Sequence, residues 1–193
     1  MRKRVYKVLL FTIGVILLFC ARAAIADSET YPEHEVKAAF MYNFLKFIDW
    51  PEEKVLDEDN TMNIFVVGDY PECKTFRDIQ EKSSEGNPVR IRIFKSYEQM
   101  GDPNVLKECH LLFICKSEKK HVTEILKIVK DSNVLTVSEY EGFLEAGGMI
   151  NFVEYNEKLR FEVNMPAATE AGLKLRSKLL KLAKRVITDD TES

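Results

Sequence analysis

Beyond residue 26, three cysteines and three histidines are the side chains best suited to metal or redox chemistry. They are Cys73, Cys109, Cys115, His34, His110 and His121. Cys109, His110 and Cys115 lie close together in the sequence, but neighbouring residues of a strand point to opposite faces. No Cys-x2-Cys pair is present either. We therefore expect neither a metal site nor a cofactor.

The spacing of the cysteines limits how they can pair. The apolar run 110–114 between Cys109 and Cys115 is typical of a buried strand, which would hold the two residues about 20 Å apart. A disulfide needs Cα atoms within about 7 Å of each other. Cys73 therefore pairs with one of these two cysteines or with neither, and the odd count leaves a thiol over in an oxidising compartment.

Carboxylates are plentiful, but their spacing does not indicate catalysis. Glu52 and Glu53 are adjacent, as are the three acids at 57–59, and both runs are typical of solvated loops. The sequence contains no G-x-S-x-G, H-E-x-x-H, P-loop or complete dinucleotide-binding motif. We expect no catalytic residues and interpret the protein as a non-enzyme.

The first 26 residues have the parts of a secretory signal peptide. A basic start precedes the apolar run 8–19, and Ala24-Ile25-Ala26 offers a cleavage site. The run of about 12 residues is shorter than the roughly 20 that span a membrane. We expect residues 1–26 to direct export and residues 27–193 to form a single domain.

The charge of the exported part differs from that of the whole chain. Residues 1–26 contain five basic residues and no acidic one, so 23 basic and 31 acidic residues remain, a formal net charge of −8. Nucleic-acid binding calls for a basic surface. The composition therefore excludes a nucleic-acid partner and favours a partner whose surface is neutral or basic.

Strands and helices alternate along the rest of the chain. The predicted strands are 62–67, 89–94, 110–114, 134–137, 149–153 and 159–163, and the predicted helices are 36–51, 73–82, 97–106, 118–130 and 167–186. This alternation is typical of a parallel sheet, to which the last two strands add an antiparallel hairpin. We expect a single α/β domain with a mixed, mostly parallel sheet flanked by helices, a C-terminal β-hairpin and a long final helix.

Two segments constrain this fold further. The helix predicted at 36–51 is apolar on nearly every side, so it must be covered by protein, and we expect it to be core. Gly147 and Gly148 precede the hairpin, where they indicate a positive φ or a close approach of backbone. In the second hairpin strand, Arg160, Glu162 and Asn164 alternate with apolar residues, as on a solvated edge or a polar recognition strip.

Six sequence blocks together resemble the YfiR-like family of exported bacterial proteins. They are VKAAFMYNFLKFIDWP at 36–51, MNIFVVGD at 62–69, ECHLLFIC at 108–115, VLTVSE at 134–139, GGMINFVEYNEKLRFEVN at 147–164 and AGLKLRSKLLKLAKRV at 171–186. Their order and spacing are similar over about 150 residues. The first and fifth blocks are the most specific.

The resemblance implies a periplasmic negative regulator that binds the periplasmic sensor region of an inner-membrane diguanylate cyclase, and so restrains cyclic-di-GMP synthesis and biofilm formation. It also implies a homodimer and redox sensitivity through disulfides. By resemblance, we predict a Cys73–Cys109 disulfide with Cys115 free. No cysteine lies at 140–164, so a second disulfide in the hairpin is not possible.

For the partner surface, the exposure pattern and the resemblance together point to the hairpin. We predict that Phe152, Arg160, Glu162, Asn164 and Leu173 contact the partner. Two alternatives stay open. The protein could be an accessory sensor for a membrane histidine kinase, or a small-molecule receptor with a cleft at the carboxyl ends of strands 62–67 and 110–114.

Overall fold

The computed structural model describes residues 31–52, 54, 61–80, 83–84 and 87–188. Pro32–Ser193 forms one compact unit, and the signal peptide predicted at 1–26 lies outside the described residues. Within the described ranges, no helix is both long enough and apolar enough to span a bilayer.

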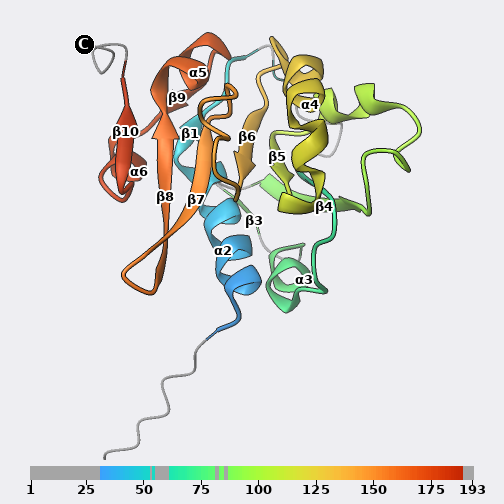
Figure 1. Cartoon of the computed structure of the whole chain (residues 1–193), viewed down its shortest axis with the longest axis horizontal. Coiled ribbons are helices and arrows are strands. Elements are labelled where there is room, and N and C mark those ends of the chain that lie inside the picture. Colours follow the sequence, from blue (N-terminus) through green and yellow to red (C-terminus); the bar gives the residue numbers. More distant parts are fainter. Residues whose placement is uncertain (1–30, 53, 55–60, 81–82, 85–86, 189–193) are drawn as a thin grey trace, which may run out of the picture. The chain divides into compact units, whose positions relative to one another are not determined.

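The unit is built on an eight-stranded sheet in the order β10-β8-β7-β6-β5-β2-β4-β3 (Figure 1). The strands are β2 (Met62–Val67), β3 (Ser83–Ser84), β4 (Asn87–Phe94), β5 (Leu111–Ile114), β6 (Leu135–Ser138), β7 (Ile150–Tyr155), β8 (Lys158–Asn164) and β10 (Arg185–Ile187). The five central strands from β4 to β7 pair in parallel, and β10 is parallel to β8. The β7–β8 and β3–β4 pairs are antiparallel. This confirms the mixed, mostly parallel sheet and the hairpin.

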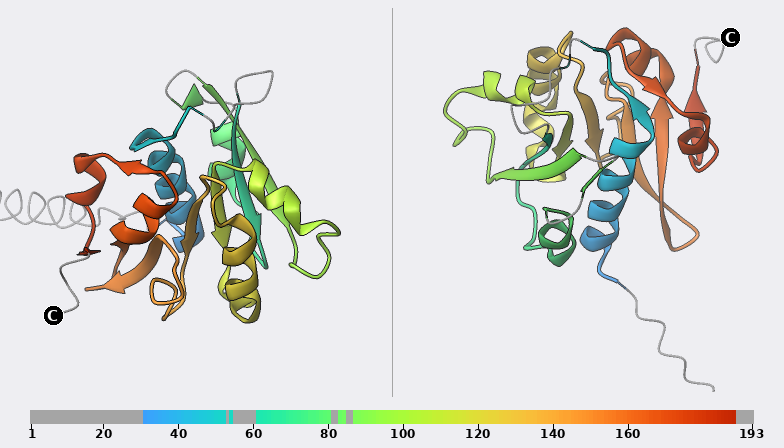
Figure 2. Two further views of the ribbon diagram at one scale, coloured as in Figure 1. Left: turned by 90° about the horizontal axis from the view of Figure 1, so that it is seen from above. Right: turned by 180° about the vertical axis from the view of Figure 1, so that it is seen from behind.

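Helices cover both faces of this sheet. They are α2 (Glu33–Lys46), α3 (Lys74–Gln80), the 3₁₀ helices η1 (Pro103–Glu108) and η2 (Lys116–His121), α4 (Val122–Val129), α5 (Met165–Glu170) and α6 (Ser177–Leu180). Figure 2 shows α2 and α4 on opposite sides of the sheet. Two further strands, β1 (Ile48–Asp49) and β9 (Lys174–Leu175), form a small antiparallel pair.

Alternation along the strands divides the interior into two cores. On β2, Ile64 and Val66 belong to the core under α2, whereas Phe65 and Val67 belong to the core under α4. A strand that buries both faces has a continuous apolar sequence, which is why the strands at 62–67 and 110–114 could be predicted.

The aromatic helix α2 belongs to the core, as its sequence predicts. Met41 is fully buried, and the ring of Phe44 lies 5.1 Å from that of Phe161 and 5.9 Å from that of Phe152. The first pair is edge-to-face and the second is stacked, and ring pairs of either kind at these distances add about 0.5–1.5 kcal/mol each beyond burial. The helix ends at Lys46, and the next residues form β1, so the chain leaves the helix earlier than predicted.

The long final helix predicted at 167–186 is wrong. Gly172 has φ +72°, a left-handed conformation that ends α5. Leu173, Leu175 and Leu179 all enter the α2-side core, but they do so from a turn, from β9 and from the one-turn helix α6. The chain then returns to the main sheet as β10.

Candidate functional site

The two faces of strand β8 differ as its alternating sequence predicts. Phe161 and Val163 enter the α2-side core, while Glu162 is the cross-strand neighbour of Asn151 on the other face. Arg160 shares that face and is exposed. The predicted polar strip of Arg160, Glu162 and Asn164 is therefore one face of the hairpin.

Two of the five residues predicted to contact a partner are core residues. Phe152 is 3% exposed and packs on Phe44, and Leu173 is 2% exposed. Phe152 lies opposite Phe161 in the hairpin, so its ring faces α2. The prediction that these two side chains present a docking surface is wrong.

Asn164 has a structural role at the end of the strip. Its Oδ1 accepts from the Ala167 amide at 3.1 Å and caps the start of α5, and its Nδ2 donates to the Leu144 carbonyl at 3.0 Å. An N-cap of this kind contributes about 1 kcal/mol. Both ends of the Asn164 amide are thus committed within the fold.

An acidic groove of about 420 Å³ lies on the polar face of the hairpin. It runs between the loop after β6 and the strands β7, β8 and β10. We call this site the acidic groove. Its lining residues are Glu139, Glu141, Gly142, Leu144, Glu145, Asn151, Phe152, Val153, Glu154, Glu162 and Arg185.

The loop at 139–148 forms one wall of the acidic groove and is anchored by apolar residues. Tyr140, Phe143 and Leu144 are buried in the α4-side core. Gly147 has φ +94°, and a Cβ at Gly148 would lie 2.3 Å from the Phe143 ring. The positive φ predicted for this glycine pair is confirmed at Gly147, and the predicted close approach is confirmed at Gly148.

Glu162 is the carboxylate held most firmly in the groove. It is 8% exposed and accepts from Arg185 at 2.7 Å and from Lys184 at 3.3 Å. Burial alone would raise its pKa, but the hydrogen bonds from Arg185 and Lys184 prevail and lower the pKa of this carboxyl. Glu162 therefore attaches β10 to β8 and stays ionised.

Glu139 is also paired within the fold. It follows β6 and forms an ion pair with the buried Lys37 of α2, which bonds Glu33 as well. Burial would lower the pKa of Lys37, yet the hydrogen bonds to Glu139 and Glu33 raise it. This ion pair ties the start of the groove loop to α2.

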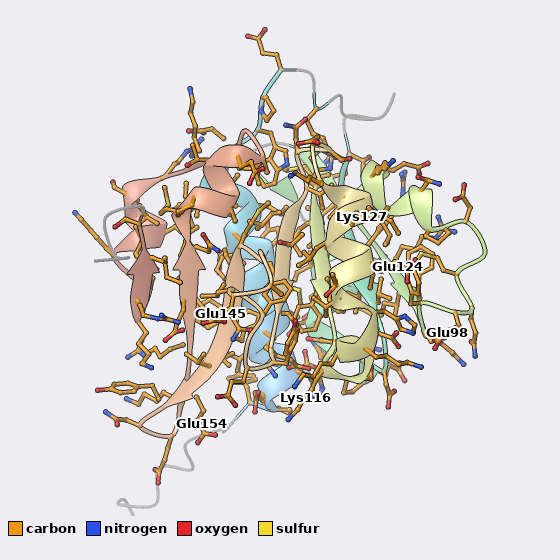
Figure 3. All side chains as sticks on the ribbon, turned by 45° about the horizontal axis from the view of Figure 1, so that its top comes forward. Glu98, Lys116, Glu124, Lys127, Glu145 and Glu154 are labelled. Atoms are coloured by element: carbon orange, nitrogen blue, oxygen red, sulfur yellow. The ribbon has the colours of Figure 1, made fainter. Side chains whose placement is uncertain are left out.

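The remaining carboxylates of the groove face solvent. Glu141, Glu145 and Glu154 are exposed, and Figure 3 shows Glu145 and Glu154 on the hairpin side of α4. Among the described residues that line the groove, Arg185 is the basic one, and it already bonds Glu162. The field in the groove is therefore negative, which favours a cationic group.

The groove also contains a buried hydrogen-bond acceptor. Asn151 is 6% exposed, and its Oδ1 is buried with no hydrogen-bond partner among the residues that the structure describes. An unpaired buried carbonyl oxygen costs roughly 1–3 kcal/mol. Because this oxygen has essentially no accessible surface, a donor from outside reaches it only if the groove widens around Asn151.

A second hollow of about 380 Å³ continues the polar face towards the hairpin tip. Its residues are Tyr155, Arg160, Leu182, Ala183 and Lys184. Tyr155 and Leu182 are 49% and 56% exposed, and Lys184 lies over the Tyr155 ring at 5.1 Å. Arg160 is thus the predicted contact residue that is both exposed and beside a cavity.

The predicted Cys73–Cys109 disulfide is not present, because Cys73, Cys109 and Cys115 are all free thiols. Cys73 lies in the α2-side core and Cys109 in the α4-side core, so the sheet separates them. Burial, reinforced by a hydrogen bond to Glu35, raises the pKa of Cys73 to about 11. Burial raises the pKa of Cys109 and of Cys115 to about 12. The thiols are protonated at neutral pH and poorly reactive.

The crevice proposed for a small molecule is closely packed. Where β2 and β5 end, a Cβ on Gly68 would lie 2.6 Å from both Cys115 Cβ and Ser117 Oγ. The Asp69 amide donates to Ser117 Oγ at 3.0 Å. A different cavity, of about 300 Å³, lies between α4 and α5 and includes Lys127, Thr136 and Ala167.

Sequence reasoning found the hairpin but missed the groove. The groove carboxylates come from 139–145, from both hairpin strands and from a face that β10 completes. The one local signal is the density of acids between Glu139 and Glu145. The sequence does not show that the chain returns as β10 beside β8, which brings Arg185 to the groove.

Comparisons with known proteins agree with this fold. The family model for DUF4154, described as YfiR/HmsC-like, matches residues 34–184. No curated protein is significantly similar in sequence.

Two solved structures are similar at low identity. A domain from Streptococcus pneumoniae, described as an ABC domain in complex with L-Trp, is 13% identical with a TM-score of 0.52, covering 78% of this chain and 60% of that chain. A conserved domain protein from Vibrio cholerae is 9% identical with a TM-score of 0.43, covering 70% of this chain and 57% of that chain. This chain spans less than two thirds of either structure, and the first likeness shows the fold alone.

Proposed function

Because the chain belongs to the YfiR/HmsC-like family, we propose that it is a periplasmic regulatory protein, not an enzyme, that binds the periplasmic sensor region of an inner-membrane diguanylate cyclase. In this role it represses cyclic-di-GMP synthesis and thereby biofilm formation. The observation that carries the proposal from family to residues is the acidic groove with the unpaired Oδ1 of Asn151.

The chemistry of the groove defines the partner segment that fits it. Glu141 and Glu145 present negative charge at the rim, and Asn151 lies within the groove. A lysine or arginine of the partner would be attracted by the carboxylates at the rim. Rim charges act mainly on the association rate and on specificity.

The hollow beside the groove extends this surface. Tyr155 and Leu182 offer exposed apolar area, and Arg160 offers a cation at its edge. Aromatic residues and arginine are enriched at the centres of protein interfaces. We therefore propose one docking surface, made of the groove and the hollow. Of the five residues predicted to contact the partner, Arg160 is the one that is exposed on this surface.

Deletion and complementation in the source bacterium test the regulatory role. Loss of the gene is expected to raise cyclic-di-GMP and biofilm, and the wild-type chain is expected to restore both. Complementation with Glu141→Lys/Glu145→Lys is expected to fail, while the charge-matched control Glu52→Lys/Glu108→Lys, at exposed sites away from the groove, is expected to succeed. Unchanged cyclic-di-GMP on deletion would reject the cyclase as the target.

The sensor-kinase alternative uses the same surface and differs in the partner. Crosslinking in intact cells with a photoreactive residue at Arg160, followed by identification of the membrane protein captured, separates the two. A diguanylate cyclase supports the proposal, and a histidine kinase replaces it.

Two further expectations stay predictions. The small-molecule receptor is predicted with a cleft at the carboxyl ends of β2 and β5, where the chain is closely packed. A thermal-shift panel without any stabilised complex would count against it. The homodimer implied by the resemblance is tested by light scattering after size-exclusion chromatography.

A further inference from the structure

Glu98, Glu118 and His121 form a cluster of potential metal ligands away from the acidic groove. One ligand atom from each of these residues lies within 4.8 Å of the other two. Glu98 follows β4, whereas Glu118 and His121 lie in η2 after β5. Figure 3 shows Glu98 and Glu124 on the side of α4 that faces away from Glu145 and Glu154.

The fold brings these segments together at one edge of the sheet. Strands β4, β2 and β5 are parallel, so their carboxyl ends meet there. The Tyr97 amide donates to Glu118 Oε2 at 3.3 Å, and the Tyr97 ring packs on the His121 ring at 4.8 Å. The carboxyl edge of a parallel sheet is where ligands bind in α/β proteins.

The carboxylate of Glu118 is buried with few partners. It is 4% exposed, and within the described part of the chain the long bond from the Tyr97 amide is its hydrogen bond. A carboxylate can accept about four hydrogen bonds, and burying one without compensation is costly. A cation beside Glu118 would supply that compensation.

His121 is held between carboxylates on both ring nitrogens. Its Nε2 lies 2.8 Å from Glu98 Oε1, and its Nδ1 lies 4.0 Å from Glu124 Oε2. Burial and the neighbouring Glu124 carboxylate raise the pKa of Tyr97. In metal sites, a carboxylate commonly faces the ring nitrogen that does not bind the metal and so orients the histidine.

The charge balance also favours a cation. Three carboxylates, those of Glu98, Glu118 and Glu124, face His121, whereas Lys120 bonds Glu98 Oε1 at 2.6 Å with a side chain that is 68% exposed. Lys120 neutralises one charge and can turn to solvent. The cluster remains negative without a further cation.

We propose that Glu98, Glu118 and His121 bind a divalent transition metal, Zn²⁺, through His121 Nε2 and the two carboxylates, with a solvent-accessible position left for water. One imidazole with two carboxylates suits Zn²⁺, whereas Ca²⁺ and Mg²⁺ take oxygen ligands alone. The side chain of Glu98 is 50% exposed, which leaves the open position on the solvent side.

Metal-binding motifs are recognised from ligands that lie close together in the sequence, so no metal site is predicted here. Glu98 is 20 residues from Glu118 and on a different strand connection. The proposal is independent of the regulatory role, since it concerns a different edge of the sheet. A bound ion would join the loop after β4 to η2.

Metal binding is tested on protein expressed from the full chain, purified and freed of metal with a chelator. Titration with Zn²⁺ in a calorimeter is expected to show one equivalent bound. Co²⁺ is expected to give a visible spectrum without the intense thiolate bands that the buried cysteines would produce. His121→Gln is expected to weaken Zn²⁺ binding at least 100-fold, and Glu124→Gln about 10-fold.

His34→Gln serves as the matched control, because His34 also lies beside a carboxylate, that of Glu35, at 3.8 Å. It is expected to bind Zn²⁺ as the wild type does. Circular dichroism of the metal-free variants checks that they fold, since the His121 side chain is 19% exposed and packs on the Tyr97 ring. Zinc binding that is absent in the wild type, or equal in wild type and His121→Gln, would overturn the proposal.

Discussion

The two faces of the β7–β8 hairpin have the same backbone but opposite chemistry. On one face, Phe152 and Phe161 lie opposite each other and pack against Phe44 of α2. On the other, Asn151 and Glu162 lie opposite each other and line the acidic groove. The difference lies in what covers each face, a helix on the first and a single loop on the second.

This comparison separates stability from recognition within one pair of strands. Because side chains alternate between faces, a change on the inner face acts on packing, while a change at the rim of the outer face acts on charge. Glu162 is intermediate, since it lines the groove and also bonds Lys184 and Arg185. Reversing its charge would therefore disturb the fold, which makes Glu141 and Glu145 the better probes of binding.

The largest effect is expected on the inner face. Phe161→Ala removes a ring that is 1% exposed and contacts Phe40 and Phe44, so it should lower the free energy of unfolding by about 3–5 kcal/mol. Urea denaturation measures this loss. Arg160→Ala, the adjacent residue on the outer face, should change it by less than about 0.5 kcal/mol. Equal losses in the two variants would contradict the division between the faces.

A smaller effect is expected in the loop that forms the wall of the groove. In Gly148→Ala, the new methyl would overlap the Phe143 ring, which must move within the α4-side core. Overpacking of this kind costs about 1–3 kcal/mol. Thermal denaturation against Ala146→Ser, an exposed change in the same loop, measures it. A fully stable Gly148→Ala protein would show that the loop adapts and that the groove wall is soft.

The smallest effect on stability is expected at Glu162. Its pKa is lowered from 4.5 in the folded protein, so its contribution is complete above that pH and is lost as the pH falls below it. Glu162→Gln should therefore cost about 1 kcal/mol at pH 7, and the difference from wild type should shrink in acid. Urea denaturation from pH 7 to pH 3 follows this trend.

Glu154→Gln is the control for this pH series, because Glu154 is exposed on the same hairpin. It should match the wild type at every pH. A cost for Glu162→Gln that stays constant from pH 7 to pH 3 would show that its ion pairs with Lys184 and Arg185 do not stabilise the fold.

The sequence was sufficient for those parts of the fold that local pattern determines. The apolar runs of β2 and β5, the aromatic helix α2 and the hairpin of β7 and β8 were all predicted from neighbouring residues. The segment 167–186 was wrongly predicted as one long helix, because its leucines also fit a helical period. The turn at Gly172, with its positive φ, and the pairing of β9 with β1 determined the outcome.

Long-range placement explains the remaining errors. Phe152 was predicted to be exposed because strand alternation does not say which face α2 covers. Cys73 and Cys109 were predicted to pair because no sequence pattern shows that the sheet lies between them. The groove and the cluster at His121 both gather residues from separate connections, and both depend on strand order.

The most direct test of the acidic groove is its affinity for the periplasmic domain of the partner cyclase. Isothermal titration measures this affinity for the wild type, for Glu141→Lys/Glu145→Lys and for the control Glu52→Lys/Glu108→Lys. Equal melting temperatures of the three proteins establish that all are folded. We predict that the groove variant binds about 100-fold more weakly, since its lysines would repel a basic segment, while the control stays within about threefold of wild type. Equal affinity of the groove variant and the wild type would contradict the account.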